Sequence, residues 1–319
     1  MKDFNSLTQQ GKMRRYHKMA HFALQSYPLV IKQIRCLTIR HNIIFRVDAL
    51  EGTYILRIGY PAIRSALMVE SEMRWLDDMR NNVDLNLSFP LRTKDNQLMV
   101  TCKVNGIPEK RYVVVLKWLN GSIIETAPTS KKLSAMGSAL AKLHTFAKDY
   151  HPTSPFMAYD SFRCDEWGGL SYLDEDNELI SAEQKAVFKE AINLSEDALT
   201  KWRKHDGLSL IHADFHLKNV NWYCGEVGVF DFDDCRWGHF LQDWGVILTW
   251  IQDKPTLYEA FVSGYQSQRI IPFSERDFTL VRIHRMMVGL TFVINYRPHN
   301  AETATNDTYV QLKLLLRDM

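Results

Sequence analysis

Two short polar patterns lie close together between residues 210 and 234. The first is His212-x-Asp214-x-x-x-x-Asn219, and the second is an apolar run that ends at Asp231. A cysteine-glycine turn signal between them predicts a short strand, a polar loop and a hairpin whose second strand ends in carboxylates. In phosphoryl transfer, one aspartate accepts the proton of the attacking hydroxyl while an asparagine and a second aspartate hold Mg²⁺ against the phosphates. Because Mg²⁺ prefers oxygen ligands, these residue types at this spacing indicate that chemistry.

Each of these residues also has a simpler structural interpretation. Asp and Asn are the commonest loop formers, so any one of them alone is more often part of a turn than of a catalytic site. The two halves together, at hairpin separation, favour function. A zinc or iron site in a hydrolase is a further alternative, because its ligand types are acceptable. That site consists of His212, Asp214, His216 and Asp231, and it gives Asn219 no role.

The segments HADFHLKN and VFDFDD resemble the catalytic and metal-binding segments of the aminoglycoside phosphotransferase and choline kinase superfamily, whose members are relatives of the protein kinases. The resemblance implies an ATP- and Mg²⁺-dependent phosphotransferase that acts on an alcohol group. It implies that Asp214 is the catalytic base and that His212 braces its loop. It further implies that Asn219 and Asp231 hold the metal. Asp233 or Asp234 is expected to assist a second metal.

The residues after the second pattern are similar to those of another family on the same fold. Gly238 and the run Gln242-Asp243-Trp244 resemble a bacterial stress-response serine/threonine kinase family, in which Asp243 is expected to cap and tie down the next helix. This favours a protein acceptor. However, only a short segment follows Asp231, with no long activation loop and no A-P-E motif, and this favours a small-molecule acceptor.

The resemblance implies an α+β, two-lobed, protein-kinase-like fold, and 319 residues suffice for two lobes. We expect residues 1–119 to form a small N-lobe with an N-terminal helix and an antiparallel nucleotide-binding sheet. We expect residues 120–319 to form a larger, mostly helical C-lobe with the catalytic loop, the metal site and the acceptor-binding helices.

Hydrophobic patterns predict the elements of the first lobe. The predicted helices span 12–27 and 63–79, and the predicted strands include 33–38, two strands within 34–58 joined by a turn at 49–52, a strand pair within 87–104, and 111–119. Protein kinases place a glycine-rich loop over the phosphates. Here residues 39–42 stand in its place, so we expect the backbone N–H groups of that turn, with Asn42, to cover the phosphates.

Arg57 lies inside an apolar strand, where a charge is costly without a partner. It stands where the related kinases carry the lysine that touches the α- and β-phosphates, and arginine binds phosphate bidentately. An outward-facing Arg57 is the alternative. Glu72 shares an apolar helix face with Trp75, so it is the expected ion-pair partner of Arg57. Glu70 competes for this role, and a solvated glutamate paired with Arg74 is the simpler interpretation.

The strand 111–119 is expected to run into the hinge between the lobes. The resemblance implies that backbone atoms there bind adenine, and the candidates are Leu116, Lys117, Trp118 and Leu119. A core strand that ends in a turn produces the same pattern.

In the second lobe, helices are predicted over 130–150 and 181–204, and two or three more over 256–316. His144 is expected to be a hydrogen-bonded core histidine. The irregular segment 159–174 resembles the region where small-molecule kinases build their acceptor site. Aromatic residues at helical spacing usually pack in the core, and this is the simpler interpretation of the region. Four residues are nevertheless candidates to face the acceptor: Arg285, Tyr296, Arg297 and His299.

Composition excludes several classes of protein. The net charge of +2 indicates no nucleic-acid partner. No apolar run reaches membrane-spanning length, and residues 1–18 lack the apolar centre of a signal peptide. The five scattered cysteines favour a reducing cytoplasm. Acidic and basic residues are balanced, so an acidic cleft for a polycationic acceptor is not indicated. The missing glycine-rich loop favours a non-catalytic nucleotide-binding module, whereas the complete set of site residues argues against one.

Overall fold

The computed structural model describes residues 4–175 and 177–319, and these form two compact units. The first unit contains the chain up to residue 121 together with 151–158 and 223–233, and the second contains the rest. The later segments were not part of the predicted N-lobe. Residues 223–233 join the first unit because β10 (Glu226–Val229) pairs in parallel with β4 (Asn86–Leu87).

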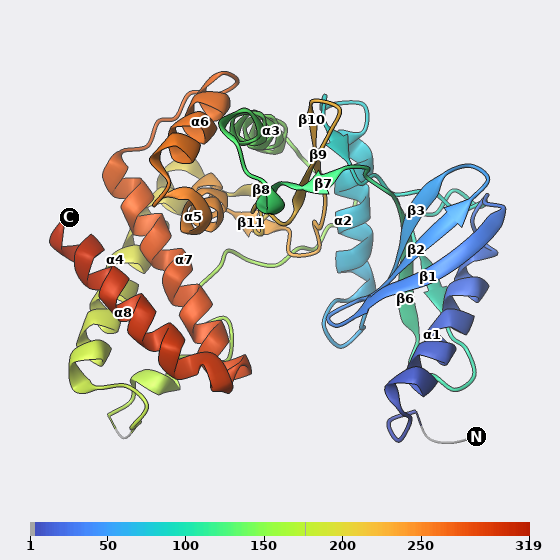
Figure 1. Ribbon diagram of the computed structural model, residues 1–319, viewed down its shortest axis with the longest axis horizontal. Coiled ribbons are helices and arrows are strands. Elements are labelled where there is room, and N and C mark those ends of the chain that lie inside the picture. Colours follow the sequence, from blue (N-terminus) through green and yellow to red (C-terminus); the bar gives the residue numbers. More distant parts are fainter. Residues whose placement is uncertain (1–3, 176) are drawn as a thin grey trace. The chain divides into compact units, whose positions relative to one another are not determined.

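The first unit is built on a five-stranded antiparallel sheet (Figure 1). Its strands, in spatial order, are β1 (Ile31–Ile39), β2 (Ile43–Ala49), β3 (Thr53–Ile58), β6 (Arg111–Lys117) and β5 (Val100–Cys102). The β2–β3 turn is closed by a 2.9 Å bond from the N–H of Ala49 to the carbonyl of Gly52, as the sequence predicts. The predicted strand pair within 87–104 is wrong, because β5 pairs with β6 and β4 pairs with β10.

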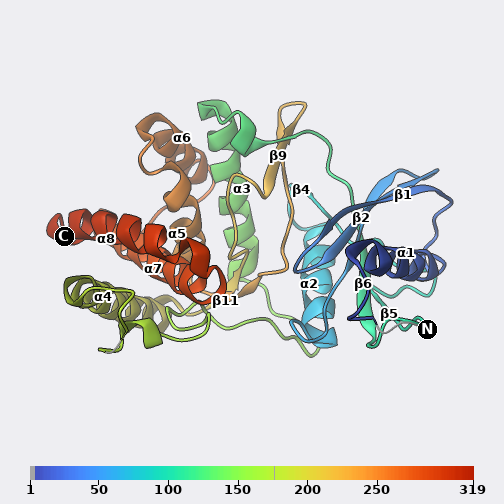
Figure 2. The same ribbon diagram turned by 60° about the horizontal axis from the view of Figure 1, so that its bottom comes forward.

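Two helices cover opposite faces of this sheet, as Figures 1 and 2 show. Helix α1 (Gln9–Leu24) begins after the N-cap Thr8, and α2 (Ala66–Met79) begins after the N-cap Ser65. Alternation along β3 sorts its side chains between the two faces. Leu56 and Ile58 join the core with α1, while the intervening residue points toward α2.

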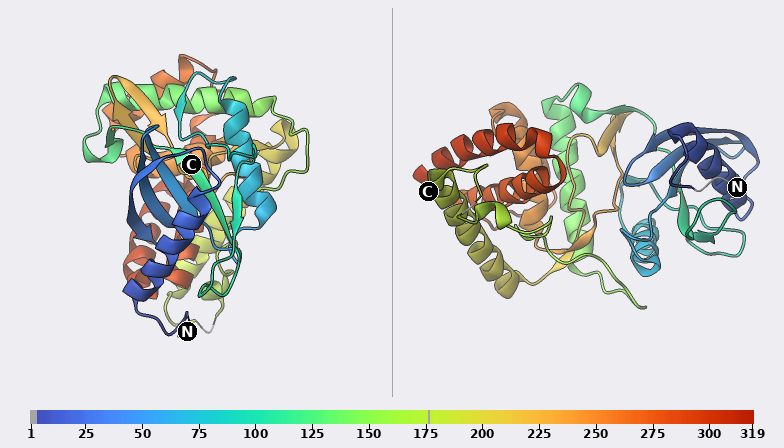
Figure 3. Two further views of the ribbon diagram at one scale, coloured as in Figure 1. Left: turned by 90° about the vertical axis from the view of Figure 1, so that its right-hand side faces the viewer. Right: turned by 90° about the horizontal axis from the view of Figure 1, so that it is seen from below.

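The second unit is mostly helical. Its helices are α3 (Ser130–Lys148), α4 (Ala182–Asp206), α5 (Phe240–Ile251), α6 (Pro255–Gln266), α7 (Glu275–Tyr296) and α8 (Ala301–Arg317). Three helices cover residues 255–317, as predicted. Helix α7 packs against α4, α5 and α8, and the views in Figures 2 and 3 show α4, α7 and α8 side by side.

Short strands and 3₁₀ turns complete the second unit. They are β7 (Ser122–Ile123), η1 (Ile124–Thr126), η2 (Ser171–Leu173), β8 (Ser209–Ile211), β9 (Val220–Tyr223), β11 (Arg236–Gly238) and η3 (Pro298–Asn300). Strand β8 pairs with β11, and β7 pairs with β9. Between β9 and β10, Cys224 and Gly225 both have positive φ, as a tight type I′ hairpin turn requires.

The antiparallel sheet of the first unit and the helices of the second confirm the predicted α+β class. Among the described residues, no helix is both long and apolar enough to cross a membrane.

Candidate functional site

The loop that follows β8 is held by a carboxylate from α5. Asp243 is fully buried, and its two oxygens accept the N–H groups of His212 at 3.1 Å and Ala213 at 2.6 Å. His144 of α3 adds a contact of 3.0 Å through its Nε2 atom. Ala213 has a φ of 69°, in the left-handed region that non-glycine residues rarely adopt. The bonds to Asp243 therefore fix the backbone conformation that presents the next residue, Asp214.

This arrangement corrects the expected role of Asp243. The N-cap of α5 is His239, whose Nδ1 accepts the N–H of Leu241, while Gln242 completes a capping box. Asp243 instead ties down the loop after β8. His144 is a hydrogen-bonded core histidine, as predicted, since its Nδ1 also lies 2.9 Å from the hydroxyl of Tyr265.

Asp214 is the centre of a network of polar side chains. Its N–H donates to Nδ1 of His212 at 3.3 Å, so His212 braces the loop from within. One carboxylate oxygen lies 3.3 Å from Nε2 of His216 and accepts the Nδ2 group of Asn219 at 2.9 Å. The other lies 3.5 Å from Nη2 of Arg285. The carboxylate is thus oriented from several sides while a quarter of the side chain, 25%, remains exposed.

These neighbours control the ionisation of Asp214. Burial raises the pKa of this carboxyl, but the hydrogen bond and charge of His216, with the charge of Arg285, lower its pKa to about 2. Asp214 is therefore a carboxylate at neutral pH, with an exposed edge that can accept a hydrogen bond from a bound hydroxyl.

The side-chain amide of Asn219 is held in one orientation. Its Nδ2 group donates to both the carbonyl, at 3.0 Å, and the carboxylate, at 2.9 Å, of Asp214. This geometry assigns Nδ2 to the Asp214 side and leaves the oxygen Oδ1 to face a cation. Amide and carboxylate oxygens are the donors that a hard divalent cation prefers, so Asn219 fits a Mg²⁺ ligand.

In the first unit, the predicted metal residue Asp231 lies two residues after the end of β10. Asp231 is exposed and has a φ of 67°, an uncommon backbone conformation for a non-glycine residue. The next residue, Phe232, is buried edge-to-face against Trp75 of α2, with ring centroids 5.6 Å apart. The buried ring of Phe232 and the left-handed backbone conformation of Asp231 together fix the position of the Asp231 carboxylate. Its oxygens, like that of Asn219, suit a hard cation.

Asn42 and Asp233 lie together in the same unit. The Nδ2 group of Asn42 donates to Oδ2 of Asp233 at 2.7 Å. The β1–β2 turn is further closed by the N–H of Arg40, which donates to the carbonyl of Asn42 at 3.0 Å. The turn that replaces a glycine-rich loop is therefore tied to the segment that carries the candidate metal carboxylates.

The predicted ion pair between Arg57 and Glu72 is present. The guanidinium of Arg57 makes two bonds to the carboxylate, of 2.9 and 2.5 Å, and both side chains are almost completely buried. The competing Glu70 pairs with Arg74 at 2.7 Å. The sequence reasoning missed Arg64, which reaches the same carboxylate at 2.6 Å.

This cluster of two arginines and one glutamate keeps a net positive charge. Burial raises the pKa of Glu72, but the charges of Arg57 and Arg64 outweigh it and hold that pKa below its usual range. One carboxylate therefore faces two guanidinium groups, so the α2-facing side of β3 favours an anion nearby.

Of the predicted hinge residues, Leu116 and Lys117 end β6, and Trp118 and Leu119 follow it. The N–H of Lys117 bonds the carbonyl of Phe89 at 2.8 Å, and that of Trp118 bonds the carbonyl of Thr53 at 3.2 Å. The N–H groups of Lys117 and Trp118 are therefore already used in hydrogen bonds within the protein. The expected adenine contact therefore shifts toward Leu119.

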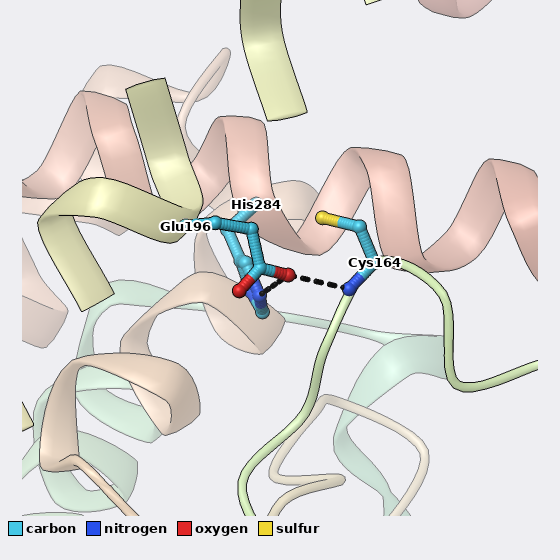
Figure 4. A group of neighbouring side chains, drawn as sticks. All are labelled: Cys164, Glu196 and His284. Carbon is cyan, nitrogen blue, oxygen red and sulfur yellow. Dashed lines mark hydrogen bonds and ion pairs between the residues drawn. The ribbon is translucent and has the colours of Figure 1, made fainter. Parts of the chain in front are cut away.

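A second polar cluster supports α7 next to Arg285. Figure 4 shows Cys164, Glu196 and His284 converging from the segment after α3, from α4 and from α7. Glu196 accepts the N–H of Cys164 at 2.7 Å and lies 3.7 Å from Nε2 of His284, an ion-pair distance rather than a hydrogen bond. The three side chains offer zinc-type ligand atoms within 4.8 Å of one another. Because Glu196 already binds a backbone N–H, we interpret this cluster as a brace that joins segment 159–174 to the helices.

The structure thus brings the predicted residues together within each unit. In the second unit, Asp214, His212 and Asn219 share one network; in the first, Arg57 pairs with Glu72 and Asn42 with Asp233. Three contacts were not predicted: those of His216 and Arg285 with Asp214, and that of Arg64 with Glu72. Arg64 lies within the predicted helix 63–79, whereas α2 begins at Ala66, so the prediction gave no indication that this side chain reaches Glu72.

The sequence of this chain matches a known protein family. The profile described as the phosphotransferase enzyme family matches residues 39–278, about three quarters of the chain. An amicoumacin kinase from Bacillus subtilis (strain 168) is 25% identical over 288 residues, which cover 81% of this chain and 79% of the relative.

Two solved structures have a similar fold. A microcompartment-associated aminopropanol kinase has a TM-score of 0.77 at 21% identity, over 95% of this chain and 98% of that chain. The amicoumacin kinase hAmiN, in complex with AMP-PNP, Ca²⁺ and Ami, has a TM-score of 0.73 at 18% identity, over 95% and 96% of the two chains.

Proposed function

The chain belongs to the phosphotransferase enzyme family, and we propose that it transfers the γ-phosphoryl group of ATP to a hydroxyl group of a small-molecule acceptor. The observation that carries this proposal is the network around Asp214, in which Asn219, His216 and Arg285 orient an ionised, partly exposed carboxylate. Relatives named as kinases of amicoumacin and of aminopropanol support a small-molecule acceptor.

Asp214 orients the acceptor hydroxyl and takes its proton. With a pKa of about 2, its carboxylate is a weak base, so it removes the proton late, when bond formation to phosphorus has made the hydroxyl acidic. This order suits a loose phosphoryl-transfer transition state, in which positioning and electrostatics supply most of the catalysis. The proton passes from the acceptor oxygen to an Asp214 oxygen as the γ-phosphoryl group leaves ADP.

Nucleotide binding is assigned to the first unit. Arg57 is proposed to neutralise the α- and β-phosphates, and Glu72 and Arg64 hold it in place. Asn42 positions the turn that covers the phosphates through its bond to Asp233. Backbone atoms among Leu116, Lys117, Trp118 and Leu119 bind adenine, with Leu119 favoured.

A divalent cation is assigned to Asn219 and Asp231, with Asp233 at a second metal. An AMP-PNP and Ca²⁺ complex of a relative supports use of a nucleotide with a divalent cation, and Mg²⁺ is the cation we propose. When bound, the cation neutralises charge that develops on the phosphate oxygens. The chain contributes oxygen donors, one of them fixed by the double hydrogen bond of Asn219 to Asp214.

Gln242 and Asp243, two of the residues that resemble a protein kinase family, have structural roles in this chain. Gln242 completes the capping box of α5, and Asp243 fixes the loop before Asp214. Both roles serve any acceptor. The segment between Asp231 and the start of α5 at Phe240 is short, which supports a small acceptor over a protein. None of the described cysteines forms a disulfide, as the proposed cytoplasmic setting favours.

An ATP-consumption screen tests the proposal. Purified enzyme with Mg²⁺ and ATP is offered metabolite alcohols, amino alcohols, hydroxy acids and a generic protein acceptor, and phosphorylated products are identified by mass spectrometry. We expect a phosphorylated small molecule whose formation is abolished by Asp214→Asn. Phosphorylation of the protein acceptor alone would overturn the assignment of acceptor class, and product formation by Asp214→Asn at the wild-type rate would overturn the catalytic assignment.

A further inference from the structure

Four residues form a continuous stripe along helix α7, and the stripe begins next to the proposed catalytic base, Asp214. Arg285, Gly289, Phe292 and Tyr296 follow one another at intervals of four, three and four residues. This spacing places them on one face of the helix. Arg285 contacts the carboxylate of Asp214 at 3.5 Å. The stripe therefore leads away from the reacting hydroxyl for about 16 Å along the helix, at 1.5 Å per residue.

The glycine within this stripe has open space in front of it. Other helix glycines of this unit allow close packing, since an added Cβ at Gly137, Gly245 or Gly264 would lie 2.1, 2.8 or 1.9 Å from a neighbouring backbone carbonyl. At Gly289 an added Cβ would meet no heavy atom of another part of the described chain within 4 Å. Close packing therefore does not require a glycine at this position, although glycine is a poor helix former. It leaves room beside the helix.

Beyond the glycine, three aromatic rings form a corner. Phe292 and Tyr296 stack with centroids 5.5 Å apart, and Trp167 stands nearly perpendicular to both, at 5.5 and 6.2 Å. Tyr296 is 58% exposed, so the corner is open on one side. Asn295 holds the loop of Trp167 through bonds of 2.8 Å to the carbonyl of Trp167 and 3.2 Å to that of Gly169. The corner is therefore rigid as well as accessible.

The charges near the stripe select among possible occupants. Arg297 already lies over the ring of Phe292, 5.1 Å from its centroid, and Arg285 stands at the other end. The charge of Arg285 is offset by Asp214, Asp234 and Glu166, whereas Arg297 lies at the corner itself. Arg297 would repel a cationic group there, even though aromatic rings attract cations in other settings. A flat, neutral aromatic group gains the ring contacts without that repulsion.

From these observations we propose that the acceptor is an alcohol with an aryl group at its far end, and that this group binds in the corner of Trp167, Phe292 and Tyr296. The linker between hydroxyl and ring crosses the open space at Gly289. The inference rests on the proposed function, because Asp214 fixes where the hydroxyl lies. It adds the length and the chemical class of the acceptor: neutral or anionic, aryl-tailed, with about 10 Å or more between hydroxyl and ring.

A series of ω-phenylalkan-1-ols of increasing linker length, each compared with the unbranched alkanol of the same chain length, tests this site. For phosphorylation by the wild-type enzyme, we expect the kcat/KM ratio of phenylalkanol to alkanol to rise about tenfold or more once the linker spans about 10 Å. Gly289→Leu fills the open space and should reduce that ratio about tenfold or more. Arg276→Leu places a leucine at an exposed position near the start of α7, 13 residues before Gly289, and should leave the ratio unchanged.

Binding is measured separately by quenching of tryptophan fluorescence, so that the result does not depend on turnover. Gly289→Ala is the milder variant, and a normal melting temperature for it and for Gly289→Leu would show that the helix is intact. Equal binding of long phenylalkanols to wild type and Gly289→Leu, or a phenyl group that brings no gain at any length, would overturn the aryl site. If the phenylalkanols bind as expected but no alcohol is phosphorylated, the proposed function fails while the site stands.

Discussion

Asp214 keeps its negative charge because its neighbours outweigh its burial. His216 and Arg285 stabilise the carboxylate, and Asn219 adds a neutral donor. The same Asn219 amide is proposed to turn its oxygen toward the metal. If both proposed roles hold, the loss of Asn219 affects metal binding as well as turnover.

We predict that Asn219→Ala raises the Mg²⁺ concentration for half-maximal activity about tenfold or more, because a ligand and its orienting bonds are removed together. The measurement is ADP release at fixed ATP across a Mg²⁺ titration. Asn193→Ala, which truncates an exposed asparagine on α4, serves as the control. An unchanged Mg²⁺ requirement for Asn219→Ala would remove this residue from the metal site.

At the scale of elements, β3 and α2 are joined by a buried ionic cluster. Arg57 and Arg64 share Glu72, and all three are nearly inaccessible to water. Glu72→Gln removes the negative charge that the two buried guanidinium groups share. We predict that Glu72→Gln lowers the free energy of unfolding by about 3–5 kcal/mol. The matched variant Glu70→Gln breaks an exposed pair on the same helix and should cost less than about 1 kcal/mol.

Urea unfolding of both variants measures this difference. Similar, small losses for Glu72→Gln and Glu70→Gln would mean that the buried cluster does not hold α2 against the sheet. A large loss only in Glu72→Gln, with ATP affinity reduced as well, is the result that the ionic cluster predicts.

The brace beneath segment 159–174 should be sensitive to acid. Burial raises the pKa of Glu196, but His284 and the N–H of Cys164 lower it to about 2, below its ordinary value of 4.5. A lowered folded-state pKa contributes stability above the unfolded value and loses it as pH falls toward 2. We predict that Glu196→Gln is less stable than wild type at pH 7, by at most about 3 kcal/mol, and that the difference shrinks by pH 3.

Chemical denaturation at several pH values measures the effect, with Glu190→Gln on the exposed side of α4 as the control. A pH-independent difference would contradict the ionised brace. Stoichiometric zinc in the purified protein that is lost in Cys164→Ser would also contradict it, because the cluster would then be a metal site.

For the whole molecule, sequence patterns predicted what depends on local periodicity. The alternation along β3 and the helical stripe of α2 placed Arg57 opposite Glu72, and the ion pair is present. The predicted pair of strands within 87–104 failed because β5 pairs with the next strand along the chain, β6, while β4 pairs with the distant strand β10. Arg64 lies in the turn before α2, although the predicted helix included it, and its contact with Glu72 depends on that turn.

Long-range contacts account for the rest. Asp243 was expected at a helix cap, but its task depends on a loop 30 residues earlier in the chain. The stripe on α7 is readable as a spacing, yet only the structure reveals the open space at Gly289 and the ring of Trp167 beside it. The resemblance of two short segments to a known family thus predicted the fold class and a set of candidate site residues. The contacts around the stripe on α7 depend on long-range packing, which no local pattern shows.

The most direct test of the central claim is a rapid-quench measurement of phosphoryl transfer from γ-labelled ATP to an accepted alcohol by wild type and Asp214→Asn. The account predicts that the variant transfers the phosphoryl group about a thousandfold more slowly, while its affinity for ATP changes by less than about threefold, because Asp214 acts on the acceptor hydroxyl rather than on the nucleotide. Transfer at the wild-type rate by Asp214→Asn would contradict it.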